Sequence, residues 1–147
     1  MGTTVCAAGL LSDGHVALVN VGDSRCYLFH EGTLTRVTQD HSLTAELIER
    51  GELQEDDATK HPYYGILTRA MGVGSEIEID RRTIAVEVGD RIALCSDGLF
   101  TELSDEMIGS ALVGDTDVET IVDKLIESAI ASGGHDNVPV VVAEVVA

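Results

Sequence analysis

The chain has 147 residues, enough for one domain with its own core, and 44% of them are hydrophobic, which is typical of a globular protein and excludes a disordered one. Its 26 acidic and 9 basic residues give a net charge of −17, which argues against nucleic acid or an anionic membrane as a partner, because both need a basic surface. The acidic excess suits either a solvated surface or carboxylate ligands for Mg²⁺, Mn²⁺ or Ca²⁺.

The first 38 residues are predicted to form a β-meander. Residues 4–11 and 16–21 are apolar runs separated by the turn sequence Ser-Asp-Gly, and they are expected to pair as a hairpin. A second hairpin is predicted where residues 26–29 and 34–37 flank Glu31-Gly32, a two-residue turn that twisted strands favour.

Residues 40–74 are predicted to form an irregular, polar insertion between strands. Residues 42–51 have helical spacing with a glycine at the end, and an acidic turn over residues 53–58 follows. His61-Pro62 then interrupts the pattern. An insertion of this length is long for a simple connection, and long ordered loops tend to be functional.

The remaining residues are predicted to contain three strands and two helices. Strands are expected over 77–88, 91–95 and 138–146, and a helix begins near Ser104. The strongest helical pattern covers 118–131, with Thr116 and Glu119 as a capping box and Gly133-Gly134 at the end. Antiparallel strands followed by segregated helices predict an α+β layered domain.

Three aspartates stand at the ends of apolar strands: Asp23, Asp97 and Asp136. Each of them alone is more often a turn or capping residue. If the strand ends converge, however, the three carboxylates can reach one cation, and oxygen-only ligands suit Mg²⁺ or Mn²⁺.

The other polar residues are weaker candidates for a site. His41 and His61 lie inside the insertion and could contact a substrate, whereas the other histidines are predicted at turns or on the surface. A phosphate site would need an arginine, but surface ion pairs are the favoured role for Arg25, Arg36 and Arg69. The three cysteines form no C-x-x-C pair, are predicted to be buried free thiols and, with no secretory or membrane-spanning segment, indicate a soluble cytoplasmic protein.

Six segments in order resemble the metal-dependent serine/threonine phosphatases of the PPM class, also called the PP2C family, and especially its bacterial members. They are MGTTVCAA, VNVGDSRCYL, LTRVTQDHSL, ILTRAMG, DRIALCSDGLF and GGHDNVPVVVAEV, and together they span nearly the whole chain. The resemblance implies a PP2C-like antiparallel β-sandwich flanked by helices. It also implies two core Mn²⁺ or Mg²⁺ ions. In such enzymes these ions activate a water that attacks the phosphorus of phosphoserine or phosphothreonine directly, and the same reaction is expected here.

The resemblance also assigns roles to individual residues. Asp97 and Asp136 match metal ligands of the core, and Asp23 with Asp97 matches a third, weaker metal site. Asn137 is expected to support Asp136 without binding the metal itself, and Gly98 is expected to do the same for Asp97. The insertion at 40–74 matches a flap beside the active site.

The first strands and metal ligands of such a domain are missing from the pattern, so residues 1–147 are expected to be a partial phosphatase domain. Pro139 also replaces the usual threonine of the last motif. The partner is expected to be a phosphoprotein substrate, and the chain is expected to be weakly active or inactive alone. Exposed sheet edges predict self-association or pairing with the missing N-terminal half. The alternative is a non-catalytic pseudophosphatase or regulatory binding module.

Overall fold

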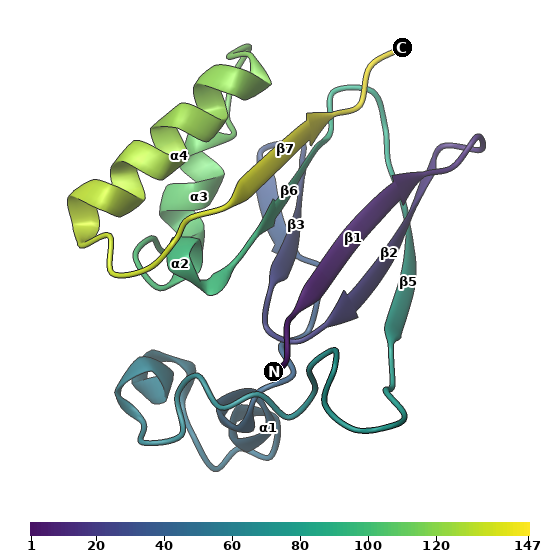
Figure 1. Cartoon of the computed structure of the whole chain (residues 1–147). Helices are drawn as coiled ribbons and strands as arrows, with labels where there is room; N and C mark the ends of the chain where they lie inside the picture. Colours follow the sequence, from purple (N-terminus) through teal and green to yellow (C-terminus); the bar gives the residue numbers. More distant parts are fainter.

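A computed structural model describes all residues from 1 to 147, and it contains two antiparallel sheets with helices (Figure 1). One sheet has the order β1-β2-β5, from β1 (Val5–Leu10), β2 (His15–Val21) and β5 (Asp80–Ala85). The other has the order β4-β3-β6-β7, from β3 (Arg25–His30), β4 (Thr33–Arg36), β6 (Arg91–Cys95) and β7 (Val140–Glu144). The helices are α1 (Leu43–Glu49), the 3₁₀ helix η1 (Glu55–Lys60), α2 (Asp97–Phe100), α3 (Asp105–Ala111) and α4 (Val118–Ser132). The predicted α+β class and β-sandwich are confirmed.

Both predicted hairpins are confirmed, but the continuous meander is wrong. β1 pairs with β2, and β3 pairs with β4 across Glu31-Gly32, where both residues have positive φ as a two-residue hairpin turn requires. However, β2 pairs next with β5 and β3 with β6, so β2 and β3 belong to different sheets. The chain crosses between the sheets at residues 22–24, which places Asp23 at one end of the sandwich.

Two hydrophobic cores lie on the two faces of the four-stranded sheet. The larger core fills the space between this sheet and the helices α2, α3 and α4, and its 11 buried residues include Tyr27, Leu99 and Leu125. The smaller core lies between the two sheets, with 6 buried residues that include Val16, Leu18 and Ile92. Helices therefore cover the sandwich on one face only, as Figure 1 shows.

The predicted helices form with small differences at their ends. Ser42 caps α1 by accepting a hydrogen bond from Ala45 N, and Gly51 follows the helix with a φ of 73°. The N-cap of α4 is Asp117 and not Thr116, because the Asp117 carboxylate accepts from both the backbone N and the hydroxyl of Thr120. The helix α2, which begins at Asp97, was not predicted because four residues are too few to show a helical period.

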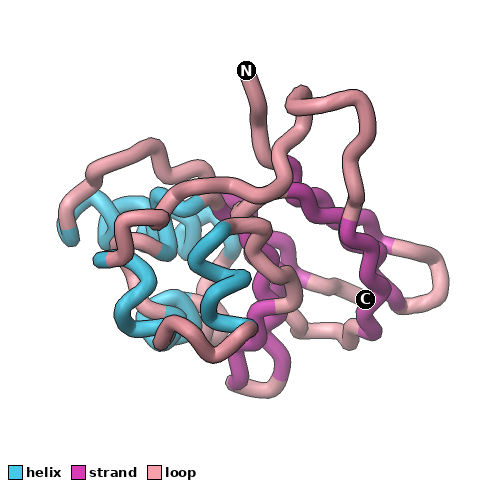
Figure 2. The backbone as a smooth tube through the Cα atoms, turned by 90° about the horizontal axis from the view of Figure 1, so that it is seen from below, coloured by secondary structure: helices cyan, strands magenta, loops and turns pink.

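The insertion lies at one end of the two sheets. It contains α1, η1 and a long connection to β5, which begins at Asp80 rather than at the predicted residue 77. Viewed from this end, helices gather on one side of the molecule and strands on the other (Figure 2). No helix is long and apolar enough to cross a membrane.

The interior of the sandwich is open between β1 and β7, each of which is an edge strand of its sheet. Leu10 pairs with buried Val16, and Val141 pairs with Leu94, which packs on the core between the sheets. Residues directly opposite in a pair of strands point to the same face, so Leu10 and Val141 also point inward. Even so, the two residues are 72% and 58% exposed. The smaller core therefore has no cover along this side.

Candidate functional site

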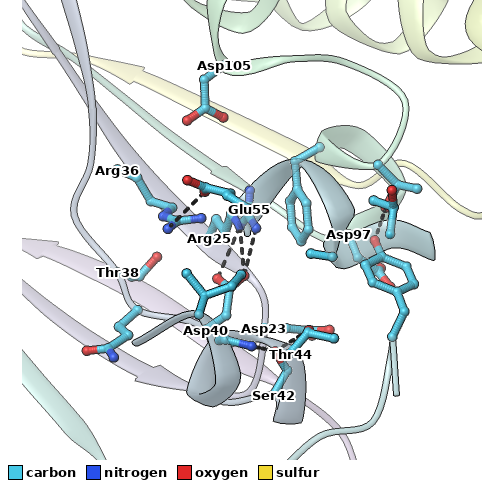
Figure 3. Close-up of a pocket in the computed structure, with 18 of the residues that line it drawn as sticks. Asp23, Arg25, Arg36, Thr38, Asp40, Ser42, Thr44, Glu55, Asp97 and Asp105 are labelled. Atoms are coloured by element: carbon cyan, nitrogen blue, oxygen red, sulfur yellow. Dashed lines mark hydrogen bonds and ion pairs between the residues drawn. The ribbon is translucent and has the colours of Figure 1, made fainter. Parts of the chain in front are cut away.

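A pocket of about 830 Å³ lies where the insertion meets the end of the sandwich (Figure 3). Residues of α1, η1, the crossing at residue 23, the segment after β4 and the segment that begins with α2 form its walls. Its lining contains three arginines and the following eight carboxylates: Asp23, Asp40, Glu49, Glu55, Asp56, Asp97, Glu102 and Asp105. A pocket with this excess of negative charge attracts cations.

The structure brings two of the three predicted aspartates, Asp23 and Asp97, together in this pocket. Asp23 follows Gly22 in the crossing between the sheets, and Asp97, two residues after the end of β6, is the first residue of α2. One Asp97 oxygen accepts a hydrogen bond from Gly98 N at 3.0 Å. Burial and then the charge of Asp97 raise the pKa of Asp23 above its ordinary value. The raised pKa of Asp23 indicates a region of negative potential that a hard cation would relieve.

The third aspartate, Asp136, does not line this pocket, although its loop lies against the Asp97 segment. Its side chain is exposed and accepts from Asn137 N at 2.7 Å. The Asn137 carbonyl accepts from the Ser96 hydroxyl at 3.3 Å and lies so close to the Gly98 Cα that any Cβ there would clash with it. Glycine at position 98 is thus required by the approach of this loop.

No group of three or more His, Cys, Asp or Glu side chains is close enough to enclose a metal ion. The pocket thus gathers carboxylates, of which Asp23 and Asp97 are two of the predicted ligands, but no complete three-ligand set.

A pair that the sequence did not predict joins the Asp97 segment to the Asp136 loop. Glu102, two residues after the end of α2, accepts from the His135 ring Nδ1 at 2.8 Å and from its backbone N at 3.3 Å. These bonds with His135 lower the pKa of Glu102. Since 33 residues separate the partners, no local pattern indicates the contact.

His41 is buried and holds the insertion to the crossing between the sheets. Its Nδ1 accepts from Gly22 N at 3.1 Å, its own backbone N donates to Gly22 O, and its Nε2 lies 3.0 Å from Asp80. The bond with His41 and then the contacts with Arg69 lower the pKa of Asp80. Because both ring nitrogens are occupied and the residue is only 5% exposed, His41 has a structural role and does not face a substrate.

Arg25 forms an ion pair, as expected, but not at the surface. Its guanidinium contacts Asp40 at 2.7 to 3.1 Å, and the two side chains are 16% and 12% exposed. It also lies 3.6 Å from the centre of the Phe100 ring and 3.3 Å from the Tyr27 hydroxyl. Burial lowers the pKa of Arg25, but Asp40 outweighs burial and raises it overall. Arg25 is therefore fully engaged and is not a free phosphate ligand.

The chain is similar to bacterial serine/threonine phosphatases in sequence and in structure. A protein-family model described as protein phosphatase 2C matches residues 1–134. The serine/threonine phosphatase stp of Listeria monocytogenes is 38% identical over 144 residues, which are 98% of this chain and 57% of that protein. The serine/threonine protein phosphatase PstP of Mycobacterium tuberculosis is 41% identical over 146 residues, 99% of this chain and 28% of PstP.

Solved structures agree. A structure of the M. tuberculosis PstP phosphatase superposes with a TM-score of 0.91 at 39% identity, covering 100% of this chain and 61% of that one. The S. agalactiae serine/threonine phosphatase gives a TM-score of 0.91 at 34% identity, covering 97% and 58%. The PstP catalytic domain is also known in complex with 2 manganese ions. The chain spans only 57% of the length of the Listeria relative, but its match to the family model extends over most of its own residues, so it belongs to the protein phosphatase 2C family of serine/threonine phosphatases.

Proposed function

We propose that the chain is part of a metal-dependent phosphatase that removes phosphate from phosphoserine and phosphothreonine in proteins. The observation that carries this proposal is the shared pocket of Asp23 and Asp97, with the Asp136 loop packed against the Asp97 segment. In this proposal Asp97 and Asp136 hold core metal ions, and Asp23 with Asp97 holds a third.

The chemistry of the donor set suits Mn²⁺ or Mg²⁺. All three side chains offer carboxylate oxygens, which these hard cations prefer, and no thiolate or imidazole points to a softer metal. When bound, such ions lower the pKa of a water and offset the charge on phosphoryl oxygens. The chain's own part is to hold the carboxylates: Gly98 admits the Asn137 carbonyl, and His41 fixes the Gly22–Asp23 segment.

The open side between β1 and β7 is the place where the proposed phosphatase needs further polypeptide. Both edge strands point apolar side chains into an uncovered interior, and the chain spans 57% of the Listeria relative. We propose that a segment corresponding to the unmatched part of the relatives adds strands there and supplies the remaining carboxylates. Alone, the chain is expected to have little or no activity and to self-associate through these edges, which sedimentation velocity would measure.

The test of the proposal is Mn²⁺ binding together with phosphopeptide hydrolysis by the 147-residue chain. Calorimetric titration of the wild type is expected to detect Mn²⁺, and Asp97→Asn and Asp136→Asn are expected to weaken or abolish the signal. Asp123→Asn, an exposed change on α4 with the same loss of charge, is the control and is expected to bind as the wild type does. Absence of binding in the wild type would contradict the metal assignment, and hydrolysis as fast as that of the PstP catalytic domain would contradict the expected inactivity.

The alternative function is a non-catalytic binding module that keeps the fold for partner recognition. It is favoured by the lack of any complete three-ligand cluster among these residues. Binding of Mn²⁺ that is equal in wild type and Asp97→Asn would support it. In either case we propose a cytoplasmic location, which the free thiols Cys6, Cys26 and Cys95 favour.

A further inference from the structure

Few hydrogen bonds join the two segments that carry Asp97 and Asp136. The Asp136 loop, residues 133–137, is exposed throughout and begins with two consecutive glycines after α4. Its first two backbone N–H groups close the end of α4 by donating to Ile130 O and Ala129 O. Beyond these, the Asn137 carbonyl accepts the hydroxyl of Ser96. A loop of this kind would sample many conformations without another tether.

Glu102 supplies that tether. Its side chain is only 7% exposed, whereas the side chain of His135 is 82% exposed. The same oxygen, Oε1, accepts from both the ring Nδ1 and the backbone N of His135. A carboxyl group on a side chain covered to this extent needs hydrogen-bond donors, and the only protein donors to it are these two nitrogens.

The position of Glu102 makes the contact specific to the proposed site. Glu102 follows α2, so it moves with Asp97, and His135 directly precedes Asp136. One side chain thus connects the backbone beside one proposed ligand to the segment of the other. Gly133 adds to the fit, because a Cβ at that position would lie 2.5 to 2.7 Å from atoms of His135 and Glu102.

We propose that Glu102 is a positioning residue that sets the distance between Asp97 and Asp136 by holding His135. The inference rests on the proposed function of the two aspartates. Glu102 itself contacts neither metal nor substrate in this role. Outer residues that orient metal ligands typically change metal affinity by about 10- to 100-fold when they are replaced.

The test uses the ¹⁵N-labelled 147-residue chain with Mn²⁺ alone as the probe. Titration with Mn²⁺, followed by the broadening of amide signals in NMR spectra, measures weak as well as tight binding. Glu102→Ala is expected to weaken Mn²⁺ affinity by about tenfold or more. Two milder variants are expected to lose less Mn²⁺ affinity than Glu102→Ala does. They are Glu102→Gln, which keeps an acceptor oxygen, and His135→Ala, which keeps the backbone donor. Glu127→Gln, an exposed change in the middle of α4, is the control.

Hydrogen exchange of the backbone amides provides a second readout. In Glu102→Ala the amides of residues 135–137 are expected to exchange faster, whereas those in the middle of α4 keep their protection, which also shows that the variant is folded. Unchanged Mn²⁺ affinity in Glu102→Ala, while Asp136→Asn loses binding, would overturn this inference and leave the proposed function in place. If the wild type binds no Mn²⁺, the metal assignment falls, and unchanged loop exchange in Glu102→Ala would then overturn the positioning role as well.

Discussion

The ion pair of Arg25 and Asp40 is expected to contribute strongly to folding, and Asp40→Asn tests this. Three contacts of 2.7 to 3.1 Å join the two side chains, which are 16% and 12% exposed. The substitution keeps the shape of residue 40 and removes its charge, so the covered guanidinium of Arg25 loses its counter-charge. Breaking a buried pair in this way typically costs 3–5 kcal/mol.

For this pair we expect a loss of about 3 kcal/mol, the lower end of that range, because some exposure remains and two other contacts persist. Arg25 still lies over the Phe100 ring and still donates to the Tyr27 hydroxyl. A domain of this size is stabilised by only about 5–15 kcal/mol, so the change is large enough to measure.

The assay is urea unfolding at pH 7, followed by circular dichroism. Glu46→Gln is the matched control, because Glu46 pairs with Arg50 at 3.3 Å on the surface of α1, where the side chains are 41% and 61% exposed. That pair is expected to contribute only about 0.3–0.5 kcal/mol and to weaken in salt. If Asp40→Asn lost no more stability than this control, the reasoning about burial would be refuted.

Three further predictions concern the cores and a surface turn. Leu125→Ala, at a position 1% exposed under α4, is expected to cost about 3 kcal/mol in urea unfolding, whereas Ile130→Ala, 61% exposed on the same helix, is expected to cost much less. A hydrogen bond with Asp90 raises the pKa of His30 in the folded chain. The stability lost in His30→Gln should therefore be greatest below the pKa that His30 has in the unfolded chain, and the loss should vanish as the pH rises through its folded-state pKa. Equal losses of stability at pH 5.5 and pH 9 would contradict this. Burial raises the pKa of the Cys26 thiol to about 12, so iodoacetamide at pH 8 should alkylate Cys26 only after urea is added. Mass spectrometry after proteolysis measures the alkylation, and modification of Cys26 before urea is added would contradict the prediction.

Local patterns predicted most of the secondary structure, because the signals for these elements lie within a few residues of one another. The Glu31-Gly32 turn and the helix capped by Ser42 are examples, and both form as expected. The patterns did not predict that β2 and β3 join different sheets. Apolar alternation gives the face of a strand but not its neighbour, and here each strand pairs with a partner from the second half of the chain.

The candidate site likewise contains residues that the sequence predicts and residues that only the structure identifies. Asp23 and Asp97 stand out in the sequence because each follows an apolar strand, and the structure places both in one pocket. Nothing local indicates the contact of Glu102, because its partner His135 lies in the loop after α4, 33 residues along the chain. The burial of His41 was likewise hidden, since its partners Gly22 and Asp80 come from distant segments.

The sequence by itself determined the family, the two hairpins, the main helices and the types of residue that could hold a cation, because turns, caps and motifs are written in neighbouring residues. Only the tertiary structure decided which carboxylates lie in one pocket, which arginine is held in a buried ion pair, and which side of the sandwich is uncovered. Those properties depend on strand order and on contacts between residues far apart in the chain. Leu10 and Val141 show this most clearly. Both are apolar residues on the inward face of their strands, as core residues are, but no other part of the chain covers them.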